Sequence, residues 1–110
     1  MSNIRFALPV LLGLFAGTTP SLAATTDSVP KFDIERSCRS ELSGGSSFGE
    51  TMASCRADEE RARDELGPRW GSFSAADKKV CIQETLIDGS PSYVELETCL
   101  DMTPSGRASR

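Results

Sequence analysis

The sequence predicts an all-α fold: a small domain of four helices, arranged as two helical hairpins and stapled by two disulfides. Three observations lead to this prediction. Apolar residues recur three and four positions apart in four segments, no segment alternates with a period of two over a useful length, and each helical segment carries one of the four cysteines. An even number of cysteines in a short chain with an export signal indicates a disulfide framework.

The first 23 residues have the order of a secretory signal peptide. A short basic start, "MSNIR", precedes the apolar run "FALPVLLGLFAG", and "TTPSLA" places Ser21 and Ala23 at the −3 and −1 positions of a cut before Ala24. The apolar run is too short to span a bilayer, which takes roughly 20 residues. We therefore expect an exported chain without a membrane span, beginning with a flexible segment over residues 24–32.

The composition of the exported chain excludes several classes of function. Loss of Arg5 with the signal peptide leaves 11 basic against 16 acidic side chains, with no basic block, so we expect neither nucleic acid nor anionic lipid as a partner. The chain has no histidine, and 16, 25 and 17 residues lie between its consecutive cysteines, whereas zinc ligands come in close pairs. There is no CxxC for thiol–disulfide exchange. We expect no metal and no cofactor.

The first two helices are predicted from their apolar faces and their end signals. The first runs from about Asp33 to Leu42, and the glycines of "SGGS" end it. The second opens at "SFGE", where Ser47 can cap the first turn and Glu50 can complete a capping box, and "GP" at residues 67–68 ends it. Its apolar stripe consists of Phe48, Met52, Cys55, Ala62 and Leu66.

The third and fourth helices complete the predicted domain. The third follows Ser74, a favourable cap, and the fourth follows "DGSP", with Ser90 as the cap and Pro91 in the first turn. The domain therefore covers residues 33–102, and residues 103–110 are expected to form a loose tail. The inward residues of the two helices are Cys81, Ile82, Thr85 and Leu86 in the third, and Tyr93, Leu96, Cys99 and Leu100 in the fourth.

Helix geometry favours one of the three disulfide patterns that four cysteines allow. Cys81 lies about seven residues before the last turn and Cys99 about eight after it, so the rise of ~1.5 Å per residue brings the two nearly level. Cys38 and Cys55 are less level, offset by about 6 Å around "SGGS". We predict Cys81–Cys99 with Cys38–Cys55. The alternative is Cys38–Cys99 with Cys55–Cys81.

The run "RADEERARDE", residues 56–65, is predicted to be the solvated face of the second helix, with one exception. Glu59 lies near the centre of the apolar stripe. A partly buried carboxylate of this kind can serve as a general acid or base. The sequence provides no histidine and no obvious nucleophile beside it, so we favour a structural role. Its expected partner is Arg63, in a buried ion pair, or a cation of the first helix such as Arg39.

The stretch "RWGSF", residues 69–73, carries the largest side chains outside the predicted helices. Such aromatics commonly close the core of a small helical domain. The alternative is a partner-facing anchor, because Trp and Tyr dominate interface hot spots and recognition residues tend to lie on loops. With the cysteines and apolar stripes assigned to the core, we predict a partner surface formed by Arg69, Trp70, Phe73 and Tyr93.

These residues also carry a resemblance to a known family. The set is Cys55-x3-Glu59-x2-Ala62-Arg63-x2-Leu66-x3-Trp70-x2-Phe73, followed by Cys81 and "PSYVELETCLDM", with "DIERSCR" near the start. It resembles an uncharacterised family of small exported, four-cysteine helical proteins of alphaproteobacteria, over roughly residues 33–102. The resemblance implies a Gram-negative periplasmic setting and supplies no activity, cofactor or catalytic residue.

Two classes of function follow from these observations. We predict a non-catalytic periplasmic module that binds an unknown protein partner or supports an envelope assembly. The alternative is a small-ligand or enzymatic role built on Glu59, Arg63 and Trp70. The missing histidine, the absence of metal-ligand spacing and the small core all weigh against the alternative.

Overall fold

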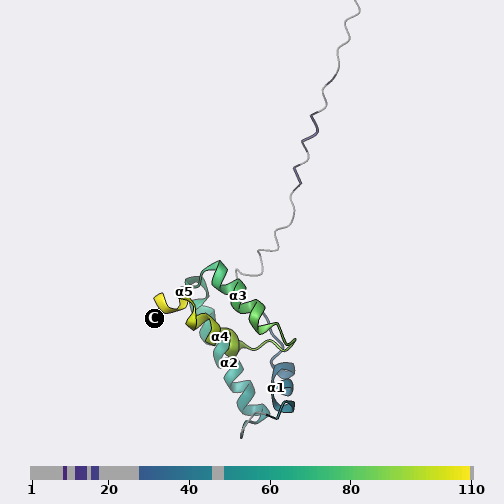
Figure 1. Cartoon of the computed structure of the whole chain (residues 1–110). Coiled ribbons are helices and arrows are strands. Elements are labelled where there is room, and N and C mark those ends of the chain that lie inside the picture. The colour runs from purple at the N-terminus through teal and green to yellow at the C-terminus, as the bar shows by residue number, and fades with distance from the viewer. Residues whose placement is uncertain (1–8, 10–11, 15, 18–27, 46–48, 110) are drawn as a thin grey trace, which may run out of the picture.

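Five α-helices and one 3-10 turn account for the regular structure in the computed structural model, which describes residues 9, 12–14, 16–17, 28–45 and 49–109 (Figure 1). The predicted all-α class is confirmed, and these residues contain no strand. In chain order the elements are α1 (Ile34–Ser43), α2 (Met52–Arg69), η2 (Trp70–Ser72), α3 (Ala75–Thr85), α4 (Tyr93–Met102) and α5 (Pro104–Ala108).

Every α-helix begins at a polar cap whose side chain accepts a hydrogen bond from a backbone N–H of the first turn. The caps are Asp33, Thr51, Ser74, Ser92 and Thr103. The prediction of Ser74 is confirmed. The start predicted for the fourth helix is wrong by two residues, because Asp88 accepts a hydrogen bond from Ser90 N at 2.9 Å and holds Ser90 in the loop.

The second helix also begins later than predicted. Gly49 has a φ of 71°, which a right-handed helix does not contain, so the helix cannot run through it. The capping box is formed instead by Thr51 and Ser54, each of whose side chains accepts from the other's backbone N–H. Glu50 precedes this cap, and the predicted cap Ser47 lies outside the described residues.

The pair Gly67–Pro68 does not end α2, which continues to Arg69 and passes directly into η2. The prediction failed because Gly67 does not adopt the left-handed conformation that would turn the chain away. Pro68 removes one helical hydrogen bond but leaves the helical path open for the last turn. The chain therefore carries Trp70 inward, where only 4 % of its surface is exposed.

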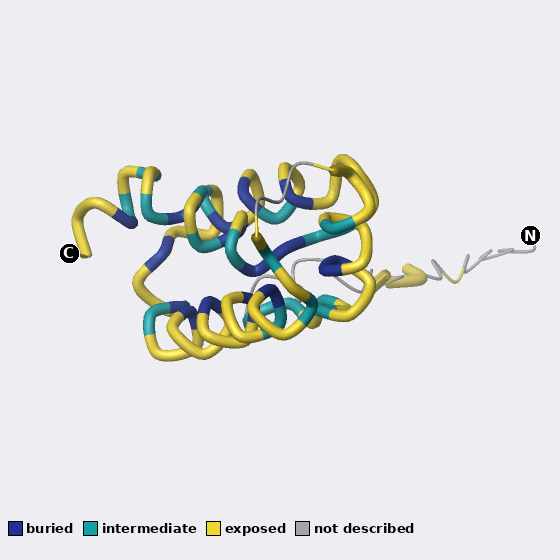
Figure 2. Tube along the Cα trace, turned by 90° about the horizontal axis from the view of Figure 1, so that it is seen from below, coloured by how far each residue is buried: buried dark blue, intermediate teal, exposed yellow. Residues whose placement is uncertain are grey.

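The helices form two disulfide-linked pairs that meet along α2 and α4. Helix α1 packs on α2, α3 packs on α4, and the two pairs join where α2 and α4 are in contact (Figure 1). Both predicted disulfides are confirmed, with Cα–Cα distances of 5.8 Å for Cys38–Cys55 and 5.6 Å for Cys81–Cys99. The outer sides of the helices are exposed and the inner sides buried (Figure 2). The core consists of Ala62, Leu66, Trp70, Phe73, Cys81, Tyr93, Leu96 and Leu100.

The expected loose tail is a fifth helix instead. Helix α5 packs on α4, and its residue Gly106 is buried against the backbone of α4. Ser105 fastens the helix to α3, since its backbone N–H donates to Asp77 at 3.2 Å and its hydroxyl donates to the same carboxylate. These hydrogen bonds lower the pKa of Asp77. The prediction failed because the contacts reach back 28 residues along the chain.

Part of the segment predicted to be flexible is also fastened to the domain. The Tyr93 hydroxyl donates to the carbonyl of Pro30 and accepts from the backbone N–H of Phe32, both at 2.8 Å. The Phe32 and Tyr93 rings lie 4.8 Å apart. The prediction of flexibility is therefore wrong for residues 30–32, while residues 24–27 lie outside the described part of the chain.

Over the described residues, no helix is both long enough and apolar enough to cross a bilayer.

Candidate functional site

Glu59 occupies the centre of the interface between the two helical pairs. It lies in the buried stripe of α2, and only 2 % of its surface is exposed. One carboxylate oxygen accepts a hydrogen bond from the Tyr93 backbone N–H at 2.7 Å, and the other accepts from the Ser92 hydroxyl. Tyr93 N–H is one of the donors that the first turn of α4 leaves without a helical partner. Glu59 therefore caps α4 from a neighbouring helix.

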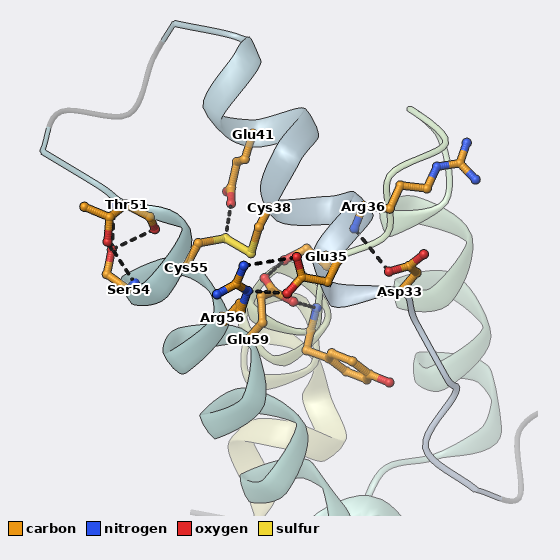
Figure 3. The surroundings of a disulfide bond; sticks show 12 residues. Asp33, Glu35, Arg36, Cys38, Glu41, Thr51, Ser54, Cys55, Arg56 and Glu59 are labelled. Carbon is orange, nitrogen blue, oxygen red and sulfur yellow. Dashed lines mark hydrogen bonds and ion pairs between the residues drawn. A yellow bond between two sulfur atoms is a disulfide. The ribbon is translucent and has the colours of Figure 1, made fainter.

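This arrangement corrects the predicted ion pair between Glu59 and Arg63. Arg63 lies on the exposed side of α2 and pairs with the adjacent Asp64 at 3.2 Å. Glu59 is engaged by Ser92 and Tyr93 at the start of α4 instead. The α1–α2 cation contact is made by Arg56, which pairs with Glu35 beside the Cys38–Cys55 bond (Figure 3).

The Glu59 contacts continue into a polar network that runs from the core to the exposed Glu95. Ser92 donates to Glu59 and accepts from Glu95 N at 3.2 Å. The Thr85 hydroxyl accepts from Ser92 N at 2.9 Å and donates to the Glu95 carboxylate at 3.0 Å. The end of α3 is thus tied to the start of α4. Every member is hydrogen-bonded, which is how a buried polar network stabilises rather than weakens a core.

The aromatic residues predicted to face a partner are buried. The exposed fractions are 4 % for Trp70, 3 % for Phe73 and 2 % for Tyr93, so the predicted surface is wrong for these three. Trp70 and Phe73 pack edge to face with centroids 6.4 Å apart. The physical reason is that η2 continues the helical path of α2 and turns both rings onto the core, so "RWGSF" is no open loop.

Two cations accompany these rings. Arg69 lies 5.2 Å from the centroid of Phe73 and pairs with Asp101 of α4, while a third of its side chain stays exposed. Lys78 Nζ lies 5.0 Å from the centroid of Trp70. Both contacts have cation–π geometry. Arg69 therefore ties the end of α2 to α4 instead of standing at the rim of an aromatic pocket.

A groove of about 410 Å³ runs along the seam of α3 and α4, on the surface that sequence reasoning did not single out. The Cys81–Cys99 disulfide forms part of its wall. The remaining lining residues are Glu84, Thr85, Ile87, Asp88, Glu95, Thr98 and Met102. A sequence signal was present, since Glu84 follows Cys81 by three residues and Glu95 precedes Cys99 by four, which places both on the cysteine faces of their helices.

The groove combines exposed apolar side chains with carboxylates. Ile87 is 83 % exposed and Met102 is 62 % exposed. Glu84 Oε2 lies 3.2 Å from Cys99 Sγ, a contact that is no hydrogen bond because a disulfide sulfur carries no proton. It places negative charge beside the disulfide and opposes the approach of a thiolate.

A second, smaller pocket of about 170 Å³ lies next to the groove, between α1 and the α3–α4 loop. It shares Asp88 and Glu95 with the groove and adds Glu41 of α1. Desolvation, together with the nearby carboxylates of Glu50, Glu59, Glu95 and Asp58, raises the pKa of Glu41. This end of the domain is therefore strongly anionic.

One group of side chains among the described residues brings potential metal-ligating atoms together. Glu41, Glu50 and Cys55 offer ligand atoms within 4.8 Å of one another. Cys55 Sγ is bonded to Cys38 and cannot act as a thiolate ligand. Two carboxylates remain, which is fewer than the six to eight oxygens that Ca²⁺ takes. The group does not form a three-ligand site.

Comparison with family models, curated proteins and solved structures finds no match for this chain. Two disulfides and no free cysteine among the described residues are typical of a protein that folds in an oxidising compartment.

Proposed function

We propose that this protein is a non-catalytic periplasmic module that binds a segment of another protein in the α3–α4 groove. The observation that carries the proposal is the groove itself, with exposed Ile87 and Met102 beside the disulfide. Exposed apolar side chains that line a concave surface are typical of docking sites. The disulfide fixes the spacing of the two helices, so the groove is preformed and loses little conformational entropy on binding.

The alternative, a catalytic or small-ligand site built on Glu59, Arg63 and Trp70, has less support. Glu59 and Trp70 are almost fully buried, and Arg63 is exposed and pairs with Asp64. The Glu59 oxygens are engaged by Ser92 and Tyr93, which supports a structural role. None of the three residues lines the α3–α4 groove or the smaller pocket beside it.

The periplasmic setting rests on the signal-peptide pattern and on the family resemblance, and the two disulfides agree with it. In this setting the chain is released after cleavage before Ala24. Intact-mass measurement of the exported protein reports the cleavage position directly.

Site-specific photocrosslinking in living cells tests the binding function. A photoreactive amino acid at Thr98, inside the groove, should capture a distinct protein adduct. The same amino acid at Glu60, on the solvated face of α2, serves as the matched control and should not. Equal labelling from both positions, or no protein adduct from Thr98, would contradict the proposed function.

A further inference from the structure

Among the described residues, the carboxylates of the α3–α4 groove have no cation beside them. Across the described residues, the ion pairs engage Glu35, Asp64, Glu65, Glu97 and Asp101, all of them outside the groove. Within this described part of the chain, Glu84, Asp88 and Glu95 take part in no ion pair. No lysine or arginine is among the described residues that line the groove. The charged side chains that line the groove are therefore all negative.

Two of the three carboxylates are held in place by neutral hydrogen bonds, and the third lies against a disulfide sulfur. Glu95 accepts from the Thr85 hydroxyl at 3.0 Å, and Asp88 accepts from Ser90 N at 2.9 Å. Glu84 rests against the Cys99 sulfur. Since each of these contacts involves one oxygen of the carboxylate, the second oxygen is available to an incoming donor. The carboxylates are therefore positioned in advance for a ligand that brings its own positive charge.

The apolar part of the groove defines the rest of the ligand. Ile87 lies beyond the end of α3 and Met102 at the end of α4, and both line the groove. A charged ligand without apolar groups would leave these side chains in water, and an apolar ligand without charge would bury the carboxylates without a partner, which is costly. The ligand that satisfies both is a cation carried beside aliphatic side chains.

We propose that the partner segment bound in this groove is cationic, with Lys or Arg flanked by aliphatic residues. The inference rests on the proposed binding function and specifies its partner. Acidic or phosphorylated segments are repelled by the three carboxylates, which gives the groove its selectivity. A second copy of this chain fits less well, because the exported sequence carries 16 acidic against 11 basic side chains.

Fluorescence anisotropy on the purified, oxidised protein tests the charge preference. The probe is a labelled amphipathic peptide of Lys and Leu, and its counterpart has Glu in place of each Lys. We expect the Lys peptide to bind at least about ten-fold more tightly, which corresponds to one charge-assisted hydrogen bond. Binding should also weaken as salt is raised, since screening acts on partly exposed charges.

A pair of charge-matched variants separates the groove from the overall negative charge. Glu84→Gln with Glu95→Gln should weaken the Lys peptide by about ten-fold or more. Asp58→Asn with Glu60→Gln removes the same charge from the exposed face of α2 and should leave binding nearly unchanged. Equal weakening by both pairs would reduce the effect to nonspecific attraction and overturn the proposal, as would equal binding of the Glu peptide.

The crosslinking experiment distinguishes this inference from the function on which it rests. Suppose that a protein adduct forms at Thr98 and that its yield does not change in the Glu84/Glu95 variant. This result would support the binding function and contradict the cationic partner. An adduct with a second copy of this chain would replace the proposed occupant. If no adduct forms at Thr98, both proposals fail together.

Discussion

At the scale of single residues, three buried or half-buried side chains carry contacts that their positions in the sequence do not reveal. Glu59 caps a helix 34 residues away, at Tyr93. Trp70 closes the core, although its neighbours suggested an open loop. Glu97 of α4 lies against Arg61 and Glu65 of α2, with 13 % of its side chain exposed. Each makes a separate prediction.

Glu59→Gln should lower the free energy of unfolding by about 1–3 kcal/mol, because the amide cannot accept from both Ser92 and Tyr93 with the strength of a carboxylate. Denaturant unfolding measures the loss. Glu60→Gln, one residue along on the exposed face, is the control and should change stability by less than about 0.5 kcal/mol. Loss of a binding or catalytic activity in Glu59→Gln protein that remains folded would contradict the structural role.

Glu97 should make the domain less stable as the pH rises. Desolvation, followed by the hydrogen bond and repulsion from Glu65, raises the pKa of Glu97 from 4.5 to about 7, against the opposing effect of Arg61. The folded state then binds the proton more tightly than the unfolded state does. The resulting stabilisation is complete below about pH 4.5 and lost as the pH passes about 7, and it amounts to about 1–3 kcal/mol.

Thermal unfolding at pH 5 and pH 8 measures this effect. Glu97→Gln should remove most of the difference between the two pH values and should be more stable than the natural chain at pH 8. Asp101, which is also acidic and near Glu97, remains in place in this variant, so its contribution is held constant. A pH dependence that survives in Glu97→Gln would assign it to other groups.

Trp70→Ala should destabilise the domain by about 3–5 kcal/mol, the cost of removing a large buried side chain and leaving a cavity. Chemical denaturation measures it. Ile87→Ala, at a residue that is 83 % exposed, should change stability by less than about 0.5 kcal/mol. If Trp70→Ala left stability unchanged, its assignment to the core would be wrong.

At the scale of elements, helix ends decide how the pieces meet. Polar caps mark the starts of the helices, and two of these starts differ from the predicted ones because turns at Gly49 and Asp88 consume the residues before them. Helix α5 is short, yet its contacts with α3 and α4 hold it on the domain. Its position depends on how closely the backbones of α5 and α4 approach.

Gly106→Ala should displace α5. A β-carbon at this position would lie 1.9 Å from the Leu100 carbonyl oxygen, and backbone cannot move aside cheaply. We expect a loss of about 1–3 kcal/mol in local stability, the usual cost of overpacking. Hydrogen exchange measures it as faster exchange of the amides in residues 104–108. Gly71→Ala, where no atom lies within 4 Å of the added carbon, should leave this exchange unchanged.

At the scale of the whole molecule, two disulfides of nearly equal sequence separation each link the two helices of one pair. The sequence separations are 17 for Cys38–Cys55 and 18 for Cys81–Cys99, so loop-closure entropy stabilises both pairs alike. Their surroundings differ. Helix α1 buries only Ser37 and Cys38, whereas α3 and α4 both contribute to the main core.

Replacing Cys38 and Cys55 together with Ala should therefore release α1 first. We expect a loss of about 2–4 kcal/mol, with the hydrogen-exchange protection of α1 falling further than that of α4. The Cys81→Ala/Cys99→Ala pair should cost a similar amount and weaken peptide binding in the groove, because α3 and α4 lose their fixed spacing. Equal loss of protection over all helices in the first variant would mean that α1 unfolds only with the rest.

The sequence by itself determined the helical class and the inward position of Glu59, and it favoured the observed disulfide pairing over one alternative. All three follow from the regular rise and periodicity of a helix, which act over a few residues and can be counted along the chain. The end signals were less decisive, because several polar residues near each boundary can act as a cap.

Only the tertiary structure decided what these side chains meet. The partners of Glu59 lie 33 and 34 residues away, α5 is held by Asp77 across 28 residues, and the groove forms from faces of α3 and α4 brought together by packing. Spacing along one helix shows which residues turn inward but not which helix lies opposite. That choice is made by the fit of several helices at once, and it placed Trp70 in the core and left the α3–α4 groove open.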